Sequence, residues 1–150
     1  MSSQFPPAMD DLVEEFEELE DWDERYDLLI DLGRELPEFP ADLQTAENVV
    51  KGCMSTVWLV TTTSQDTETN QQHIHIQADS DSIIVKGLIV VLLSFFDGHT
   101  AEDIIRHDAE EYFGKLGLNQ HLSPQRRNGL FSMVKRLKEL AVQFASNSDR

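Results

Sequence analysis

The spacing of apolar residues near the start of the chain predicts two short helices. Leu12, Phe16 and Leu19 recur at helical intervals among acidic residues, which is typical of an amphipathic helix. Asp21 and Glu24 then form a capping-box pattern ahead of a second apolar stripe. A glycine and two prolines follow that stripe. Because proline lacks the backbone donor and restricts the residue before it, these residues end the second helix.

The middle of the chain changes to a strand pattern. Residues 48–51 and 55–63 are rich in valine and threonine, and they flank a glycine-containing turn at residues 52–54. Residues 73–78 alternate strictly between polar and apolar side chains, as a half-buried strand does. The economical interpretation is a three-stranded antiparallel meander made of these three segments.

A run of apolar residues after the strands predicts the central helix. Residues 83–96 follow several Asp and Ser side chains that can cap a helix. The run has 14 residues and includes one lysine, which suits a buried helix better than a membrane span of about 20 residues. Capping patterns that begin at Thr100 and Asp108 predict two short helices, and Ser123 with Pro124 opens a long amphipathic one.

Together these elements predict an α+β fold in which helices pack on one face of a small three-stranded antiparallel sheet. The chain has 150 residues, 40% of them apolar, so it can bury one core without disulfides or metals. We expect a flexible N-terminus over residues 1–10 and a single domain over residues 11–147. The first residues show neither a secretory signal nor an Arg-rich transit pattern, so we expect a cytoplasmic location and no membrane insertion.

Charge and cysteine content exclude several classes of function. The formal net charge of −16 repels nucleic-acid phosphates, so DNA or RNA binding is not expected. The single cysteine cannot form an internal disulfide. One thiolate also cannot replace the roughly four ligands of a permanent iron–sulfur cluster or structural zinc site. We therefore expect no metal bound by this chain.

The charges are unevenly distributed along the chain. Residues 10–51 carry sixteen acidic residues against three basic ones, whereas residues 123–150 carry six basic residues against two acidic ones. Two interpretations stay open: a solvated surface that aids solubility, or electrostatic steering of a basic partner toward the N-terminal half.

Cys53 is the main candidate for chemistry. It follows Gly52 in the turn between two predicted strands, and loops on a rigid scaffold commonly present functional side chains. A free cysteine also packs often as a small buried hydrophobe. Its position alone therefore leaves a functional and a structural interpretation open.

The segment around the cysteine reads Asn-Val-Val-Lys-Gly-Cys-Met-Ser-Thr-Val-Trp-Leu. It is similar to the active-cysteine segment of SufE proteins and their CsdE relatives, which accept sulfur for iron–sulfur cluster assembly. The other three matching segments are residues 32–37, 79–88 and 121–130. This resemblance favours the functional interpretation of Cys53.

The resemblance implies a SufE/IscU-like fold and a persulfide on Cys53. The donor would be a SufS-like or CsdA-like cysteine desulfurase, and the sulfur would pass on to a SufBCD-like scaffold complex. The chain would then be a carrier that enhances desulfurase turnover, and not itself an enzyme. No lysine lies in a recognisable pyridoxal-phosphate context, so that cofactor is expected on the desulfurase and none on this chain. A homodimer is an open alternative.

Four further residues are candidates for supporting the cysteine. Gly52 permits the turn before it, and Arg126, which matches a family arginine, is a candidate for holding an acidic group or stabilising a sulfur anion. Asp81 is expected to cap the following helix or to pair with Arg126. His121 is a candidate for moving protons, with capping or packing as the alternative. Met54 stands where the family usually has a polar residue.

Two other functions remain as alternatives. In a cysteine hydrolase, Cys53, His121 and Asp81 would act as nucleophile, base and orienting group. A cluster or metal scaffold would instead require ligands from several chains, because this chain has one cysteine.

Overall fold

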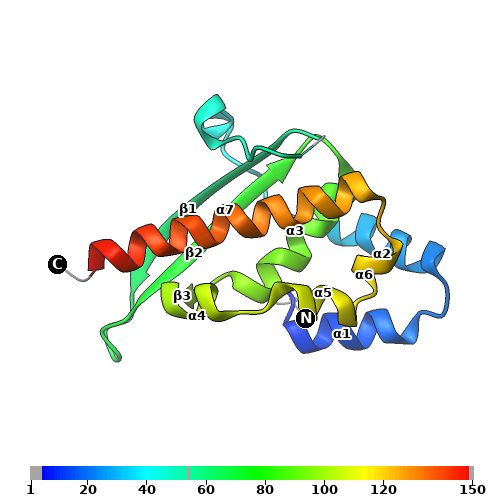
Figure 1. Ribbon diagram of the computed structural model, residues 1–150, viewed down its shortest axis with the longest axis horizontal. Helices are drawn as coiled ribbons and strands as arrows, with labels where there is room; N and C mark the ends of the chain where they lie inside the picture. The colour runs from blue at the N-terminus through cyan, green and yellow to red at the C-terminus, as the bar shows by residue number, and fades with distance from the viewer. Residues whose placement is uncertain (1–4, 54, 149–150) are drawn as a thin grey trace.

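The computed structural model describes residues 5–53 and 55–148, which fold into an α+β domain with a three-stranded antiparallel sheet (Figure 1). The elements in chain order are α1 Met9–Glu18, α2 Trp22–Arg34, the 3-10 helices η1 Ala41–Leu43 and η2 Ala46–Asn48, β1 Val57–Gln65, β2 Gln72–Ser80, α3 Ile83–Phe96, β3 His99–Thr100, α4 Ala101–Arg106, α5 Ala109–Lys115, α6 Leu118–His121 and α7 Pro124–Ser148. The predicted fold class is confirmed.

The predicted helix starts are confirmed by side-chain caps. Asp21 accepts a hydrogen bond from the backbone N–H three residues later at 2.9 Å, Thr100 does the same at 3.2 Å and Asp108 at 3.1 Å. Ser123 caps α7 in the same way at 3.3 Å. These bonds satisfy donors that a helix start would otherwise leave open.

Helix α1 begins inside the segment that the sequence predicted to be a flexible N-terminus. Of the N-terminus predicted to be flexible, residues 1–4 lie outside the described residues, and α1 begins at Met9. The buried residues of α1 are Leu12 and Phe16, two of the three that set the predicted helical spacing.

The sheet has the order β1-β2-β3, and its strands are antiparallel. The β1–β2 register runs from Val57 opposite Ser80 to Gln65 opposite Gln72. Alternate residues of both strands are buried, among them Leu59 and Ile76, so one face of the sheet packs on the core. The strict alternation in the sequence of β2 correctly predicted this arrangement.

The third strand differs from the prediction. Residues 48–51 form no strand: Asn48 ends η2, and only Val49 makes a bridge to β1, at Trp58. The Asn48 side chain donates a hydrogen bond to the Leu43 carbonyl at 2.8 Å, and such local bonds compete with strand pairing. The third strand is β3, which pairs with β2 at its other edge.

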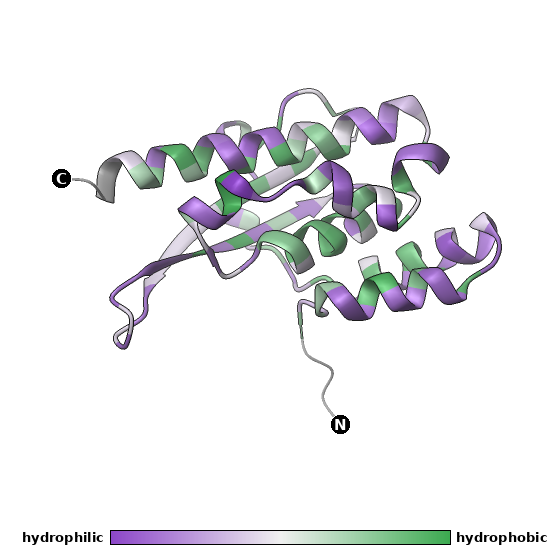
Figure 2. Ribbon diagram, turned by 60° about the horizontal axis from the view of Figure 1, so that its bottom comes forward, coloured by the Kyte–Doolittle hydropathy of each residue, from purple (hydrophilic) through white to green (hydrophobic). Residues whose placement is uncertain are grey.

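Helix α3 lies at the centre of the domain, and eleven of its 14 residues are buried. Figure 2 shows it hydrophobic along nearly its whole length, whereas α1 and α7 mix hydrophilic and hydrophobic positions. A Cβ on Gly87 would collide with the backbone of Leu29 in α2, and one on Gly33 would lie 2.6 Å from the Ile83 carbonyl oxygen. Two glycines thus allow α2 and α3 to touch backbone to backbone.

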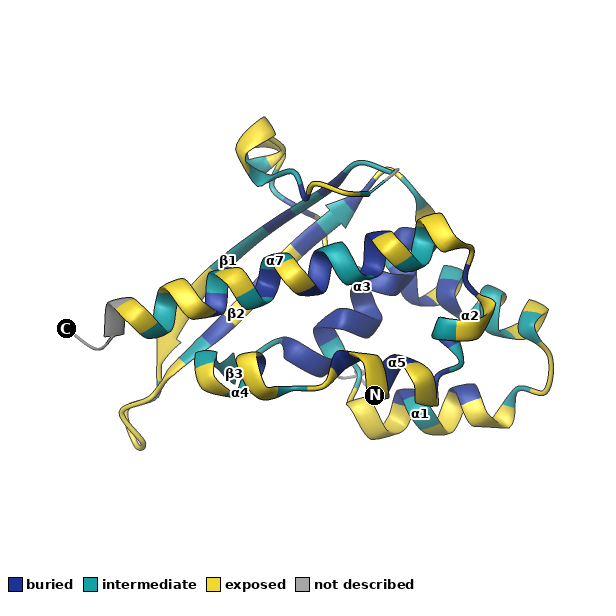
Figure 3. Ribbon diagram, viewed as in Figure 1, coloured by how far each residue is buried: buried dark blue, intermediate teal, exposed yellow. Residues whose placement is uncertain are grey.

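Helix α7 crosses the domain and packs on α3 and α4 (Figure 1). One side of the helix is buried and the other is exposed, as Figure 3 shows. The buried residues are those of the predicted amphipathic stripe, including Leu130, Met133 and Leu137. Among the described residues, no helix is both long enough and apolar enough to cross a membrane.

Candidate functional site: the Cys53 loop and its cavity

The turn before Cys53 requires a glycine. Gly52 has a φ of 95°, in the left-handed region that other residues rarely adopt. A Cβ at this position would also lie 2.5 Å from the Ser132 hydroxyl oxygen of α7. The predicted role of Gly52 in the turn therefore has two physical causes, its backbone angle and its closeness to α7.

Two hydrogen bonds hold the loop of Cys53 against α7. The Ser132 hydroxyl donates to the Gly52 carbonyl, and the Cys53 thiol donates to the Gly129 carbonyl. The donor–acceptor distance is 3.5 Å in both bonds. A Cβ on Gly129 would be only 3.6 Å from the Cys53 sulfur, so the helix backbone and the thiol are near neighbours. The Ser132 bond is long for a hydroxyl donor and a thiol is a weak donor, so the attachment of the loop is weak.

The Cys53 thiol is partly buried against the core. Burial raises the pKa of this thiol above its ordinary value, because a thiolate loses solvation there. The bond to the Gly129 carbonyl also requires the protonated form. Cys53 is therefore held as a neutral thiol in the free chain, and the lowered pKa of an activated cysteine is absent.

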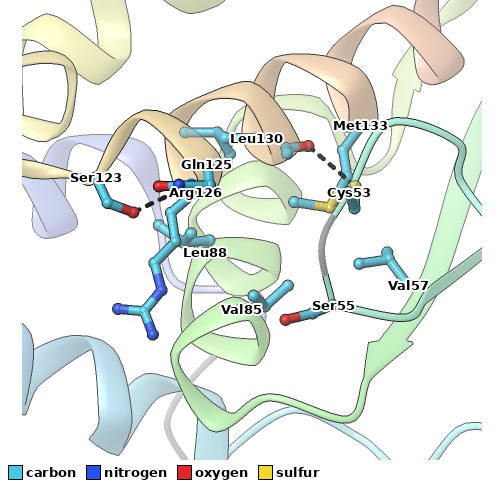
Figure 4. A pocket seen from close by; sticks show the side chains of 11 residues that line it. Cys53, Ser55, Val57, Val85, Leu88, Ser123, Gln125, Arg126, Leu130 and Met133 are labelled. Atoms are coloured by element: carbon cyan, nitrogen blue, oxygen red, sulfur yellow. Dashed lines mark hydrogen bonds between the residues drawn. The ribbon is translucent and has the colours of Figure 1, made fainter.

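A cavity of about 340 Å³ adjoins Cys53 between α7, α3 and the start of β1 (Figure 4). Apolar and polar groups contribute nearly equally to its lining, and the polar ones lie both before β1, at Ser55, and around the start of α7. The residues are Cys53, Ser55, Val57, Val85, Leu88, Ser123, Gln125, Arg126, Gly129, Leu130 and Met133. The size and composition are those of a site for a small ligand or for a few atoms of a partner.

Arg126, a candidate supporting residue in the sequence, is among the residues that line this cavity. Its Nη1 donates to the hydroxyl of Tyr26 in α2 at 3.1 Å, and its guanidinium lies 5.9 Å from the centre of the Tyr26 ring. The expected pair with Asp81 is not formed. Arg126 therefore adds a positive charge to the lining of the cavity, and the aromatic residue Tyr26 holds its guanidinium in position.

Asp81 supports the loop and does not cap the helix. Its carboxylate accepts the Thr56 N–H at 3.2 Å, and the Asp81 N–H donates to the Thr56 carbonyl at 3.3 Å. The cap of α3 is Ser82, which accepts the Val85 N–H at 3.4 Å. The expected capping role was assigned one residue too early, because Asp81 is already engaged by the segment that follows Cys53.

His121 lies outside the Cys53 cavity. Its exposed ring stacks on Trp22, with 4.5 Å between ring centres and 22° between ring planes. The packing interpretation of this histidine thus has direct support. The structure places neither His121 nor Asp81 in a hydrogen bond with the cysteine, so the arrangement a hydrolase would need is not assembled.

Tyr26 and Ser132 belong to the site and were missed in the sequence. Tyr26 counted there only as part of an apolar stripe, and Ser132 was not singled out. Their partners lie 100 and 80 positions away in the chain, and no local pattern reports such contacts. Met54, the predicted departure from the family, lies outside the described residues.

Metal ligands do not gather in the part of the chain that the structure describes. There, no group of three or more His, Cys, Asp or Glu side chains is placed to hold a metal ion. The chemistry available at the site is that of one thiol, one guanidinium and a cavity lined by apolar side chains together with Ser55, Ser123 and Gln125.

Comparison with known proteins extends over most of the chain. The family model described as the SufE Fe-S metabolism associated domain matches residues 10–141. A SufE-like protein of Rhizobium meliloti is 44% identical over 134 residues, which cover 89% of this chain and 94% of that protein. A SufE-like protein of Rhizobium etli is 45% identical over 137 residues, which cover 91% of each.

A solved structure has the same fold. The solution structure of a hypothetical protein from Thermus thermophilus superposes with a TM-score of 0.72 and covers 95% of this chain and 99% of its own. At 18% sequence identity this likeness concerns the fold alone. The family model and the two curated relatives, in contrast, place this chain by its sequence: it belongs to the SufE family, whose domain is associated with iron–sulfur metabolism.

Proposed function

We propose that this chain is a sulfur acceptor that carries sulfane sulfur on Cys53. It receives the sulfur from a pyridoxal-phosphate-dependent cysteine desulfurase of the SufS or CsdA type, enhances the turnover of that enzyme, and relays the sulfur to a SufBCD-like assembly complex. The observation that carries this proposal is the position of the only cysteine of a SufE-family chain, in a loop beside a cavity.

The chemistry follows thiol–disulfide exchange. The Cys53 thiolate attacks the outer sulfur of the persulfide on the desulfurase, the sulfur–sulfur bond of the donor breaks, and the donor cysteine leaves as a thiolate. One sulfur–sulfur bond is formed and one is broken, so no external oxidant is needed. The pyridoxal phosphate acts earlier, on the partner, where it supports cleavage of the carbon–sulfur bond.

The geometry of the thiol suggests how transfer is limited to the right partner. Burial raises the pKa of Cys53, so a free chain has few thiolates near neutral pH. The loop is attached to α7 by two bonds of 3.5 Å, which little binding energy would release. We infer that docking on the desulfurase releases the loop and exposes the thiol to the donor.

Other parts of the proposal follow from the same chemistry. A reducing cytoplasm would keep a lone cysteine free of disulfides until a persulfide is offered. No nucleic acid, membrane or bound metal takes part. One chain is proposed to be sufficient for the transfer, with a homodimer as the alternative.

Mass spectrometry after incubation with the desulfurase and free cysteine tests the proposal. We expect the wild-type chain to gain the mass of one sulfur atom, on the peptide that contains Cys53, and to lose it on reduction. Cys53→Ser should bind the desulfurase but gain no sulfur. A matched control is Cys53→Ser combined with Thr67→Cys, which moves the only thiol to an exposed turn; this variant should gain little. Labelling of Cys53→Ser, or none of the wild type, would contradict the proposal.

A further inference from the structure

The charge of Arg126 is not neutralised by a neighbouring carboxylate. The chain contains 28 acidic and 12 basic residues, and other arginines, such as Arg34 and Arg106, pair with nearby aspartates. Arg126 has no carboxylate within 4.0 Å among residues 5–53 and 55–148. Its only side-chain partner there is the neutral Tyr26 hydroxyl. A guanidinium has five N–H donors, so most of them remain available.

The two neighbouring arginines on this side of the molecule are held differently. Arg127 donates to the Asn119 carbonyl at 2.8 Å, and Arg25 donates to the Leu19 carbonyl at 3.1 Å. Each of these two guanidinium groups is thus hydrogen-bonded to a backbone carbonyl and links its helix to a neighbouring segment. Tyr26 instead presents a hydroxyl and a ring face, which fix the orientation of Arg126 and leave its charge uncompensated.

The charge of Arg126 lies in the same cavity as the Cys53 thiol. Arg126 and Cys53 line the same cavity, and in Figure 4 they stand at opposite ends of it. The lining includes the apolar residues Val85, Leu88 and Leu130, and Ser55, Ser123 and Gln125 add polar groups to it. Charges in a partly buried setting interact more strongly than charges in water. An anion at the Arg126 end would therefore be held firmly, and an apolar spacer could reach the sulfur.

We propose that Arg126 forms a carboxylate-binding subsite of the Cys53 cavity, and that the cavity accepts a small thiol that carries a carboxylate on an apolar spacer. This inference rests on the proposed function, because the thiol would take sulfur from persulfidated Cys53. Guanidinium and carboxylate match in geometry and can form two parallel hydrogen bonds. The bound carboxylate orients the thiol toward the outer sulfur of the persulfide.

The transfer step is balanced without any further reactant. The thiolate of the small molecule attacks the outer sulfur of the Cys53 persulfide and forms a new sulfur–sulfur bond. The bond between that sulfur and the Cys53 Sγ breaks, and Cys53 leaves as a thiolate that takes up one proton. The product is the persulfide of the small thiol. The overall oxidation state is unchanged, since one sulfane sulfur has moved.

The subsite is tested first on the reduced protein, where no persulfide is involved. Cys53 is alkylated with haloacids of two or more chain lengths and with the corresponding neutral haloamides. The alkylation rate with the acid, divided by the rate with the amide of the same length, rises when a positive charge lies within reach of the carboxylate. We expect Arg126→Gln to lower this ratio about tenfold for the best chain length, the effect of losing a hydrogen bond to a charged group. Arg127→Gln is the matched control: it removes the same charge one residue away, outside the cavity lining, and should leave the ratio nearly unchanged.

The second arm tests the sulfur recipient. Cys53 is loaded chemically with inorganic polysulfide, so that the desulfurase is not needed, and is then offered thiols of increasing spacer length that end in either a carboxylate or an alcohol. We expect the carboxylate thiols to be preferred at one spacer length, and Arg126→Gln to abolish the preference while Arg127→Gln retains it. Comparing the same thiols between variants cancels their intrinsic reactivities.

The outcomes separate this inference from the proposed function. Equal effects of Arg126→Gln and Arg127→Gln on the alkylation ratio would overturn the subsite, whatever happens with the desulfurase. An Arg126-dependent ratio without any preference for carboxylate thiols would overturn the small-thiol recipient. Failure of the desulfurase to label Cys53 would contradict the proposed function. The alkylation ratio and the transfer from chemically loaded Cys53 would still test the subsite, because neither experiment uses the desulfurase. Unchanged thermal unfolding of both variants would show that the fold is retained.

Discussion

The two ends of helix α3 face opposite kinds of surroundings. Val85 and Leu88 near its start line the cavity beside Cys53. Phe95 near its end stacks on Tyr112, with 4.6 Å between ring centres and 11° between planes, and contacts the His107 ring at 4.7 Å. One end of a single buried helix thus adjoins an open cavity, and the other is packed with aromatic rings.

Both ends hold a titratable group in its neutral form, with different consequences. Burial raises the pKa of Tyr112 to about 12, and its hydroxyl is bonded to that of Ser94 at 2.8 Å. Burial also raises the pKa of Cys53, but the thiol has only the 3.5 Å bond to Gly129 and a cavity beside it. The tyrosine hydroxyl is held by a strong hydrogen bond among packed rings and is structural, whereas the cysteine has only a weak thiol hydrogen bond and a cavity beside it, so it is available for chemistry.

The largest expected effect compares two leucines one turn apart in α3. Leu92→Ala removes a fully buried side chain away from the cavity and should lower the free energy of unfolding by about 4 kcal/mol. Leu88→Ala enlarges a cavity that already exists, and we expect a loss of about 2 kcal/mol. Urea unfolding measures both. Equal losses would mean that the cavity end is packed as tightly as the rest of the helix.

A smaller effect should separate loop strain from loop function. Gly52→Ala forces alanine into a left-handed backbone and against Ser132, which should cost about 1–2 kcal/mol. It should also loosen the loop and speed alkylation of Cys53. Gly98→Ala is the matched control, with φ of 79° and nothing within 4 Å of an added Cβ. A similar stability loss without faster alkylation is expected there, and faster alkylation in the control would contradict the local attachment of the loop.

The pH dependence of alkylation sharpens the contrast between the cysteine and an exposed thiol. The alkylation rate follows the fraction of Cys53 that is thiolate. Because burial raises the pKa of Cys53, the rate should reach half its maximum at a higher pH than the rate of an ordinary cysteine does. Cys53→Ser with Thr67→Cys supplies the exposed reference. The pKa of Cys53 is higher in the folded chain than in the unfolded chain, so the folded chain holds the proton more tightly. The contribution of Cys53 to the free energy of unfolding is therefore fully present below its unfolded-state pKa, and it is lost as the pH rises through its folded-state pKa. Equal midpoints in both variants would contradict the burial of the thiol.

The smallest expected effect lies at the aromatic end. Tyr112→Phe removes the bond to Ser94, whose hydroxyl keeps the Val91 carbonyl as a partner at 2.7 Å. We expect a loss of about 1 kcal/mol in the free energy of unfolding. Alkylation of Cys53 should be unchanged, because the two ends of α3 act independently. A clear change in the alkylation rate would show that they are coupled.

Local patterns in the sequence were enough to predict most of the fold. Capping residues such as Asp21 and Thr100, the alternation of β2 and the apolar run of α3 each express a preference of a few neighbouring residues. The third strand was placed wrongly because β3 has two residues, too few to show a period. The valine-rich segment before Cys53 was taken for a strand, although its Asn48 side chain favours a local turn.

The site was less accessible to sequence reasoning than the fold. Cys53 was found because it is the only cysteine and lies in a segment similar to a known family. The roles of Arg126 and Asp81 depended on contacts with Tyr26 and Thr56, which are distant in sequence. Charge alone suggested that Arg126 and Asp81 would pair, but each has a better-placed neutral partner. Such choices are decided by packing, which only the three-dimensional arrangement contains.

The most direct test of the central claim is a chase with radioactive sulfur. The desulfurase is loaded with labelled sulfur from cysteine, freed of excess substrate and then mixed with this chain in a single turnover. We predict that the label moves to the wild-type chain, is released by a reducing agent and is absent from Cys53→Ser. Label that stays on the desulfurase, or that reaches Cys53→Ser equally, would contradict sulfur transfer to Cys53.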